Sequence, residues 1–166
     1  NPGNPDNPYN PENPYGPDNP SSIDYHSIMG VAWLDENKDG ERQTTEELLS
    51  NVTVSLVDMK DKAIAKSTTT NSNGEYNFEN LEQGTYIVVF RYDTNRYRLT
   101  DYRKMNVSSL LNSDAIEETI TLNGEKVSVG ITDEIELNES KNNIDIGLIE
   151  LKNEENLKLD KYISKV

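Results

Sequence analysis

The stretch Asp35–Glu46, which reads D-E-N-K-D-G-E-R-Q-T-T-E, constrains the fold of this chain more than any other feature. It matches the calcium-loop pattern D-x-[DN]-x-[DN]-G-x5-E at every specified position. In that pattern, side-chain oxygens come from the first, third and fifth residues, a backbone carbonyl from the seventh, and a bidentate carboxylate from the last. The predicted calcium ligands are therefore Asp35, Asn37, Asp39, Glu41 through its backbone carbonyl, and Glu46.

The residues around this loop indicate a β-protein and not a pair of helices. Ser27–Leu34, directly before the loop, is strand-like, and Arg42 stands where helical loops of this kind usually carry an aliphatic residue. Gly40 permits the sharp turn that the loop requires. We therefore expect an EF-hand-like loop within a β-fold, where it holds calcium for structure. The alternative is an acidic hairpin turn without metal, because D-x-N-x-D-G is good turn chemistry by itself.

Short alternating segments separated by turn residues predict a core between residues 28 and 149. Val52–Leu56 alternates with period two, as a half-buried strand does. Thr85–Tyr92 is the most apolar segment, and Asn123-Gly124 is the signal of a type I′ hairpin. Further strands are predicted at Ala63–Thr70, around Tyr76 and Phe78, and at Thr119–Leu122, Val127–Ile131 and Asn143–Glu150. About seven or eight short strands with turns between them predict an all-β fold, a β-sandwich.

Proline defines a separate segment at the start of the chain. All seven prolines fall at positions 2, 5, 8, 11, 14, 17 and 20, a strict period of three. A polyproline II helix has three residues per turn, so the segment predicts an extended form that reaches roughly 60 Å. Glycine does not recur at every third residue, which argues against a collagen triple helix. We expect a semi-rigid stalk or linker; the alternative is a docking arm whose Tyr9 and Tyr15 pack on a neighbour.

These patterns divide the chain into three parts. Residues 1–22 are the predicted stalk, residues 23–151 the sandwich, and residues 152–166 a linker followed by the first strand of a further domain. Leu157–Val166 starts a strand-like pattern that has no partner within the chain.

Composition limits the partners of the protein. The net charge of −14 argues against nucleic acid, whose phosphates such a chain would repel, and suits a solvated surface that binds cations. There is no cysteine, so disulfides and Cys-zinc sites are excluded. No apolar run approaches the ~20 residues that span a bilayer. No signal-peptide pattern is present, and we expect a mature or excised chain.

No combination of residues predicts an active site. The single histidine, His26, and the lack of cysteine leave few pairs of nucleophile and base. The chain contains no G-x-S-x-G, P-loop or G-x-G-x-x-G motif. We expect His26 to be a residue of a strand edge and Trp33 to belong to the core. The prediction is that the protein is not an enzyme and has no catalytic residues.

Three stretches together resemble the SdrD B-like repeat of serine–aspartate-rich surface proteins of Gram-positive bacteria, and more distantly the Cna-B prealbumin-like domain. They are G-V-A-W-L-D-E-N-K-D-G (30–40), T-N-S-N-G-E-Y-N-F-E-N-L-E-Q-G-T-Y (70–86) and I-D-I-G-L (144–148). The resemblance implies a Greek-key β-sandwich displayed on the cell surface, often in tandem. It also implies that the first acidic loop binds calcium and rigidifies the rod, which assigns calcium binding to the loop residues named above.

The chain departs from related domains in its cross-linking residues. Many Cna-B domains join a lysine and an asparagine in an isopeptide bond, but the first predicted strand, Ile23–Leu34, has no lysine. Asn143 and Asp145 lie near the last strand without that partner, so no internal isopeptide is expected. Lys161 is a candidate for a cross-link to a following domain, with a plain surface lysine as the alternative. Two further acidic segments are weak candidates for a second calcium site, Asn112-Ser113-Asp114 and Asp133-Glu134.

Three functions remain open at this point. The first is a non-catalytic, calcium-stabilised spacer module in a multi-domain protein or fibre of the cell surface or cell wall of a Gram-positive bacterium, with adjacent domains or copies as its partners. The second is an adhesin module that binds a host or cell-surface ligand, which predicts an exposed apolar groove. The third is a filament subunit that docks through its terminal arms.

Overall fold

The structure is a computed structural model that describes residues 23–151 of the chain. The predicted stalk, the predicted strand Leu157–Val166 and Lys161 lie outside the described residues, so these predictions stay as they are. The described part contains strands, turns and irregular segments, with no helix that is long and apolar enough to cross a membrane. The strands are β1 (Tyr25–Leu34), β2 (Thr53–Asp58), β3 (Ala63–Thr69), β4 (Glu75–Glu82), β5 (Gly84–Arg91), β6 (Tyr97–Leu99), β7 (Ile116–Leu122), β8 (Glu125–Ile131), β9 (Ile135–Leu137) and β10 (Ile146–Glu150).

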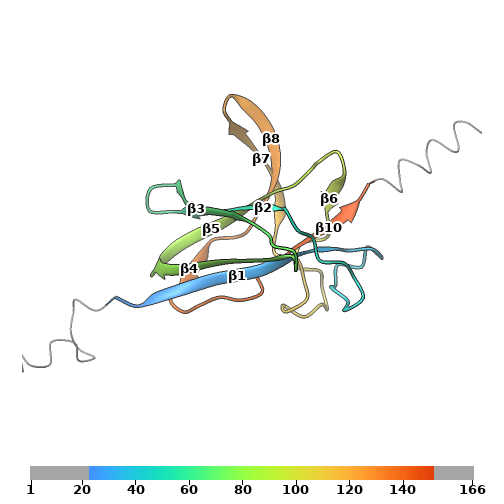
Figure 1. Cartoon of the computed structure of the whole chain (residues 1–166), viewed down its shortest axis with the longest axis horizontal. Helices are drawn as coiled ribbons and strands as arrows, with labels where there is room; N and C mark the ends of the chain where they lie inside the picture. The colour runs from blue at the N-terminus through green and yellow to red at the C-terminus, as the bar shows by residue number, and fades with distance from the viewer. Residues whose placement is uncertain (1–22, 152–166) are drawn as a thin grey trace, which may run out of the picture.

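The strands form two sheets that enclose the core, as Figure 1 shows. One sheet has the order β4-β1-β10-β6, and the other has the order β3-β2-β5-β8-β7, with β9 paired to β5. The predicted all-β Greek-key sandwich is confirmed. Eight of the strands have five or more residues, in line with the predicted seven or eight. The other two, β6 and β9, have three residues each and were not predicted, because segments this short have no readable period.

Alternation along the strands builds the core. Val54 and Leu56 of β2 face Val88 and Phe90 of β5, and all four side chains are fully buried. Since successive side chains of a strand point to opposite faces, Ser55 and Val89 between them lie on the other face of the sheet, where Ser55 is also buried. Trp33 is also fully buried, as predicted.

The last strand is shorter than predicted and is buried on both faces. Asn143–Glu150 was expected to be one strand with one apolar face, but β10 begins at Ile146. β10 lies between β1 and β6 in its sheet, and its first four residues are all buried. The preceding residues are irregular because Asp145 uses its side chain, and not its backbone, to pair with β1.

The predicted hairpin is confirmed at the β7–β8 turn. Asn123 and Gly124 have φ angles of 52° and 84°, the left-handed values that a type I′ turn needs at both central positions. The hairpin pairs Ile116–Leu122 with Glu125–Ile131 and projects from the body of the sandwich (Figure 1).

The strands that begin and end the described sandwich lie side by side and run in the same direction. β1 pairs in parallel with β10 in the register Ala32↔Ile146, Trp33↔Gly147 and Leu34↔Leu148. Because the two strands are parallel, the start of β1 and the end of β10 lie at opposite ends of the molecule (Figure 1).

Candidate metal centre

The acidic loop directly follows β1 and lies beside the end of β10. The Asp35 backbone N–H donates to the Leu148 carbonyl at 2.7 Å, and the Leu34 N–H donates to the Glu47 carbonyl at 2.8 Å. The two ends of the loop are therefore tied to the central strands of the sandwich.

Three predicted ligands come together in this loop. Carboxylate oxygens of Asp35, Asp39 and Glu46 lie within 4.8 Å of one another. Asp35 is 1% exposed and Glu46 is 9% exposed, so two of the three charges are largely shielded from water. Oxygen donors gathered in this way fit a hard divalent cation such as Ca²⁺. It is the only group of this kind within residues 23–151.

Backbone N–H groups hold these carboxylates in place. Asp35 Oδ2 accepts a hydrogen bond from the Gly40 N–H at 2.8 Å. Glu46 accepts from the Glu36 N–H at 2.9 Å and from the Gln43 N–H at 3.0 Å, one on each oxygen. The loop can wrap inward because Gly40 adopts φ 77°, a left-handed conformation that glycine takes without strain. Hydrogen bonds within the loop therefore hold its acidic side chains close together.

The remaining two predicted ligands are placed differently. Asn37 Nδ2 donates to Asp39 Oδ2 at 3.2 Å, so its side chain lies at the edge of the cluster. Glu41 was predicted to act through its backbone carbonyl; its N–H donates to Asp39 Oδ1 at 3.0 Å. The roles of both residues as ligands stay predictions.

Thr100 is a member of the site that sequence reasoning missed. Its hydroxyl donates to Asp35 Oδ2 at 2.6 Å, and both residues are buried. Thr100 follows β6, which pairs with β10, so the tie depends on sheet pairing between distant segments. No local sequence pattern marks this threonine.

Burial and hydrogen bonding have opposite effects on the pKa values of the acidic side chains. Burial raises the pKa of Glu46, and the nearby negative charge of Asp35 raises it further. For Asp39, burial also raises the pKa, but hydrogen bonds from the Glu41 backbone and the Gln43 side chain outweigh it, so the pKa is lowered. A bound cation would relieve the repulsion among the carboxylates.

The two other acidic segments have structural partners. Asp114 Oδ2 accepts from the Asp145 N–H at 2.9 Å, and its Oδ1 accepts from Arg103 Nε at 3.2 Å. Ser113 Oγ accepts from the Gly147 N–H at 3.0 Å. Asp133 pairs with Arg103 at 3.5 Å. These contacts tie the segment before β7 to β10.

Asp145 is a buried acid that completes the pairing between β1 and the segment before β10. It is fully buried, and its Oδ1 accepts from the Val31 N–H at 2.8 Å, while Oδ2 has no hydrogen-bond partner. Burial raises the pKa of Asp145 to about 7; the Val31 hydrogen bond and Arg42 oppose this rise, and Asp114 adds to it. Near neutral pH this carboxyl therefore gains or loses its proton.

Folding is expected to weaken as the pH rises toward neutrality, measured with a chelator present. The Asp145 carboxyl has a pKa of about 7 when folded, above its ordinary value of 3.8, so the folded state binds the proton more tightly. The contribution of the protonated Asp145 carboxyl to the free energy of unfolding is complete below pH ~4. It is lost as the pH rises through ~7, which lowers the free energy of unfolding by about 4 kcal/mol from this group alone. Asp145→Asn should flatten the profile in urea titrations between pH 4 and 8, and Glu139→Gln, at an exposed position, should not. An unchanged slope in Asp145→Asn would contradict the assignment.

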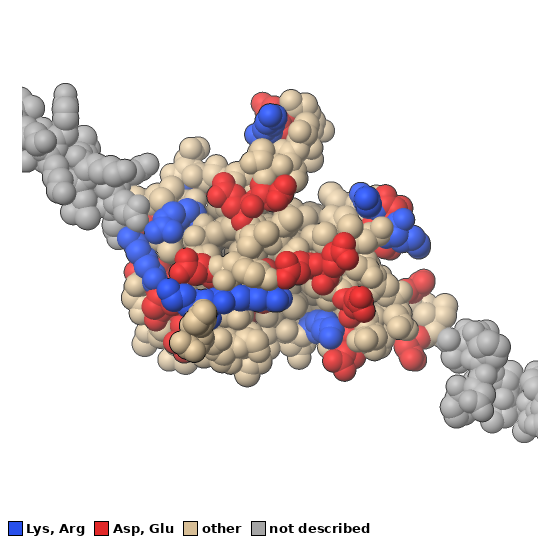
Figure 2. All heavy atoms as spheres, turned by 180° about the vertical axis from the view of Figure 1, so that it is seen from behind, with Lys and Arg blue, Asp and Glu red and all other residues tan. Residues whose placement is uncertain are grey.

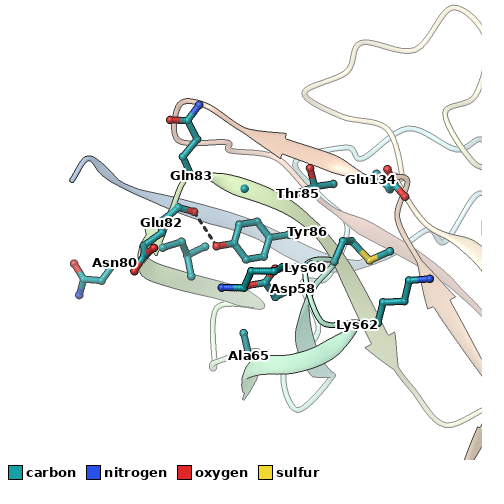
Figure 3. A pocket seen from close by; sticks show the side chains of 13 residues that line it. Asp58, Lys60, Lys62, Ala65, Asn80, Glu82, Gln83, Thr85, Tyr86 and Glu134 are labelled. Atoms are coloured by element: carbon teal, nitrogen blue, oxygen red, sulfur yellow. Dashed lines mark hydrogen bonds between the residues drawn. The ribbon is translucent and has the colours of Figure 1, made fainter. Parts of the chain in front are cut away.

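One hollow of the described surface has a mainly polar lining. It has a volume of about 700 Å³ and lies near the end where β1 begins (Figure 3). Charged side chains such as Asp58, Lys60 and Glu82 line it, and the Tyr86 hydroxyl donates to the Glu82 carbonyl at 2.8 Å. Figure 2 shows acidic side chains over the middle of one face with basic side chains among them.

His26 lies within β1, paired with Leu81, as expected for a strand residue.

Sequence comparison connects the chain with a known domain family. A model of the SdrD B-like domain matches residues 26–148. The chain is 42% identical over 65 residues to the bone sialoprotein-binding protein of Staphylococcus aureus (strain MRSA252), which covers 39% of this chain and 6% of that protein. It is 45% identical over 65 residues to serine-aspartate repeat-containing protein I of Staphylococcus saprophyticus, covering 39% of this chain and 3% of that protein. The chain thus spans a small part of these relatives.

Comparison with solved structures finds two pilins among the matches. The minor pilin of Streptococcus agalactiae matches with a TM-score of 0.42 and 12% identity, over 77% of this chain and 45% of the pilin. The shaft pilin of Lactobacillus rhamnosus GG matches with a TM-score of 0.41 and 8% identity, over 76% of this chain and 51% of the pilin.

Proposed function

The chain belongs to the SdrD B-like domain family, and on this premise we propose that it is a non-catalytic, calcium-stabilised spacer module of a multi-domain protein on a bacterial cell surface. The observation that carries the proposal is the position of the carboxylate cluster. Asp35, Asp39 and Glu46 gather where β1 ends, and the Asp35 backbone is bonded to Leu148 of β10. A cation held there fixes the loop against the two strands that connect the module to whatever precedes and follows it.

The strand arrangement supports a mechanical role. A pull on both ends of the described sandwich draws β1 and β10 in opposite directions along their length, because the strands are parallel and the ends lie at opposite poles. The hydrogen bonds between the two strands then bear the pulling force together and do not break one after another. Adjacent modules of an extracellular array are the partners that this geometry suits.

Single-molecule pulling through the two termini of the full chain tests the spacer role. With calcium, we expect a single high-force unfolding event, and with chelator a lower force, because the loop no longer clamps Asp35 beside β10. Glu36→Ala, in the same loop but outside the predicted ligand set, serves as the control and should retain the calcium effect. Equal unfolding forces with calcium and with chelator would contradict the proposal.

The adhesin alternative predicts an apolar groove. Of two hollows of similar volume, one of about 700 Å³ is lined by charged residues such as Asp58, Lys60 and Glu82, and one of about 640 Å³ has Met29, Val31 and Tyr76 in its lining. The predicted cross-link through Lys161 concerns residues outside the described part and stays a prediction.

A further inference from the structure

A small hollow with aromatic walls lies at the end of the molecule where β10 ends. It has a volume of about 330 Å³, and its lining includes Tyr92, Arg96 and Tyr97. Tyr97 pairs with Glu150, the last residue of β10, which places the hollow at that pole. Both tyrosine rings are half-buried and pack against the core, so they are held in fixed orientations while part of each stays accessible.

Arg96 completes a polar wall beside these rings. Its guanidinium lies 5.0 Å from the centre of the Tyr97 ring, and Glu150 holds it there through a contact of 3.3 Å. Leu49 and Val52 also line the hollow and are 8% and 5% exposed, and the rest of the lining is polar, from Glu47, Ser50, Asn51 and Asp93. The hollow thus combines tyrosine rings, two apolar side chains and guanidinium donors within a largely polar lining.

The chain itself contains a segment that is a suitable ligand for this hollow. Proline at every third position of residues 1–20 repeats the P-x-x-P spacing, which aromatic-lined grooves recognise in the polyproline II form. Such a segment lacks N–H groups at its prolines and has unpaired carbonyls, so it needs donors such as those of Arg96.

Charge and tyrosine content together distinguish two stretches of this segment. Glu47 and Asp93 lie at the hollow, and they repel the triplets that carry Asp6, Glu12 or Asp18. The stretches 1–5, 7–11 and 13–17 carry no charged side chain and each contains one P-x-x-P pair. Of these, only 7–11, N-P-Y-N-P, and 13–17, N-P-Y-G-P, also contain a tyrosine.

We propose that the hollow at Tyr92, Arg96 and Tyr97 binds the proline-rich segment of a second copy of this chain through residues 7–11 or 13–17. The segment leads into β1, whose ten residues span roughly 33 Å and separate it from the pole that carries the hollow. The segment is joined to the start of β1 at one pole and the hollow lies at the opposite pole, so binding between two molecules joins copies head to tail. The inference goes beyond the spacer role and does not use the metal loop, so either can fail without the other.

The test uses the full chain and a fluorescent peptide with the sequence of residues 1–20. A segment variant, with alanine in place of Pro8, Pro11, Pro14 and Pro17, keeps its hollow but loses its own ligand. We expect this variant to bind the peptide and to sediment as a monomer, while the unmodified chain gains mass with concentration. Tyr97→Ala and Arg96→Ala should each weaken peptide binding about tenfold or more, and Tyr25→Ala, an exposed tyrosine at the other pole, should not.

Three results would overturn the proposal. If the peptide still binds to both Tyr97→Ala and Arg96→Ala, the binding site lies elsewhere. Arg96→Ala is included because the side chain of Arg96 is exposed and can be removed without disturbing the core. If the peptide does not bind to the segment variant, the proline-rich segment is not the ligand of this hollow. A monomeric unmodified chain, combined with peptide binding by the segment variant alone, shows that each chain fills its own hollow.

Discussion

Calcium is expected to raise the melting temperature of the protein and to protect the loop 35–46 from proteolysis. The carboxylates of Asp35, Asp39 and Glu46 lie within 4.8 Å of one another, and a cation that binds only the folded loop stabilises the fold by mass action. At a free calcium concentration a hundred times the Kd, the gain is ~2.7 kcal/mol. For a domain of this size, that corresponds to a shift of roughly 10 °C. Calorimetry and limited proteolysis with calcium or chelator measure the two effects.

Asp35→Ala should abolish both calcium effects, and Glu36→Ala should preserve them. Each variant removes one negative charge from the loop, but only Asp35 belongs to the carboxylate cluster. Asp35 also accepts hydrogen bonds from Gly40 and Thr100, so its replacement lowers stability even in chelator. The increment on adding calcium is therefore the quantity to compare. If chelator leaves the melting temperature of the unmodified protein unchanged, the metal assignment fails.

Gly30→Ala is expected to be the most damaging single-methyl change in the sandwich. A β-carbon at Gly30 would lie 1.9 Å from the Ile144 carbonyl oxygen and 2.9 Å from Asp145 Oδ1. The segment before β10 would have to move away from β1, which breaks the bond between Val31 and Asp145 and displaces the Ile144 carbonyl from the Tyr76 hydroxyl. We expect a loss of about 4 kcal/mol or more, seen as a melting temperature lower by roughly 15 °C.

Gly84→Ala is the matched control for this prediction. A β-carbon at Gly84 would meet nothing closer than the Tyr86 ring at 3.6 Å, an ordinary contact. The stability of the control, measured by urea titration, should stay within about 0.5 kcal/mol of that of the unmodified protein. A Gly30→Ala protein that melts within about 3 °C of the unmodified chain would show that the segment before β10 is not packed as described.

Local signals in the sequence predicted much of the fold. The spacing of Asp35, Asp39 and Glu46 is set within one short loop, and the structure brings their oxygens together. The Asn123-Gly124 turn also depends on two adjacent residues only. Alternation of apolar residues marked most of the longer strands, because the side-chain period of two is a property of each strand by itself.

Contacts between distant segments could not be predicted in this way. The bond from Thr100 to Asp35 joins residues that lie 65 positions apart, and it exists only because β6 pairs with β10. In the sequence, Asp145 was noted only for lying near the last strand without a lysine partner, yet it replaces a backbone partner of Val31. The strand predicted from Asn143 therefore begins at Ile146.

The sequence by itself determined the class of fold, the acidic loop and the turns, since each of these is encoded by neighbouring residues. The tertiary structure alone decided that β1 and β10 run parallel, that the loop is tied to both, and that the tyrosine-lined hollow lies at the pole opposite the start of β1. The physical reason is that pairing between segments depends on which surfaces meet when the core is buried, and the period of a single segment does not specify its partner.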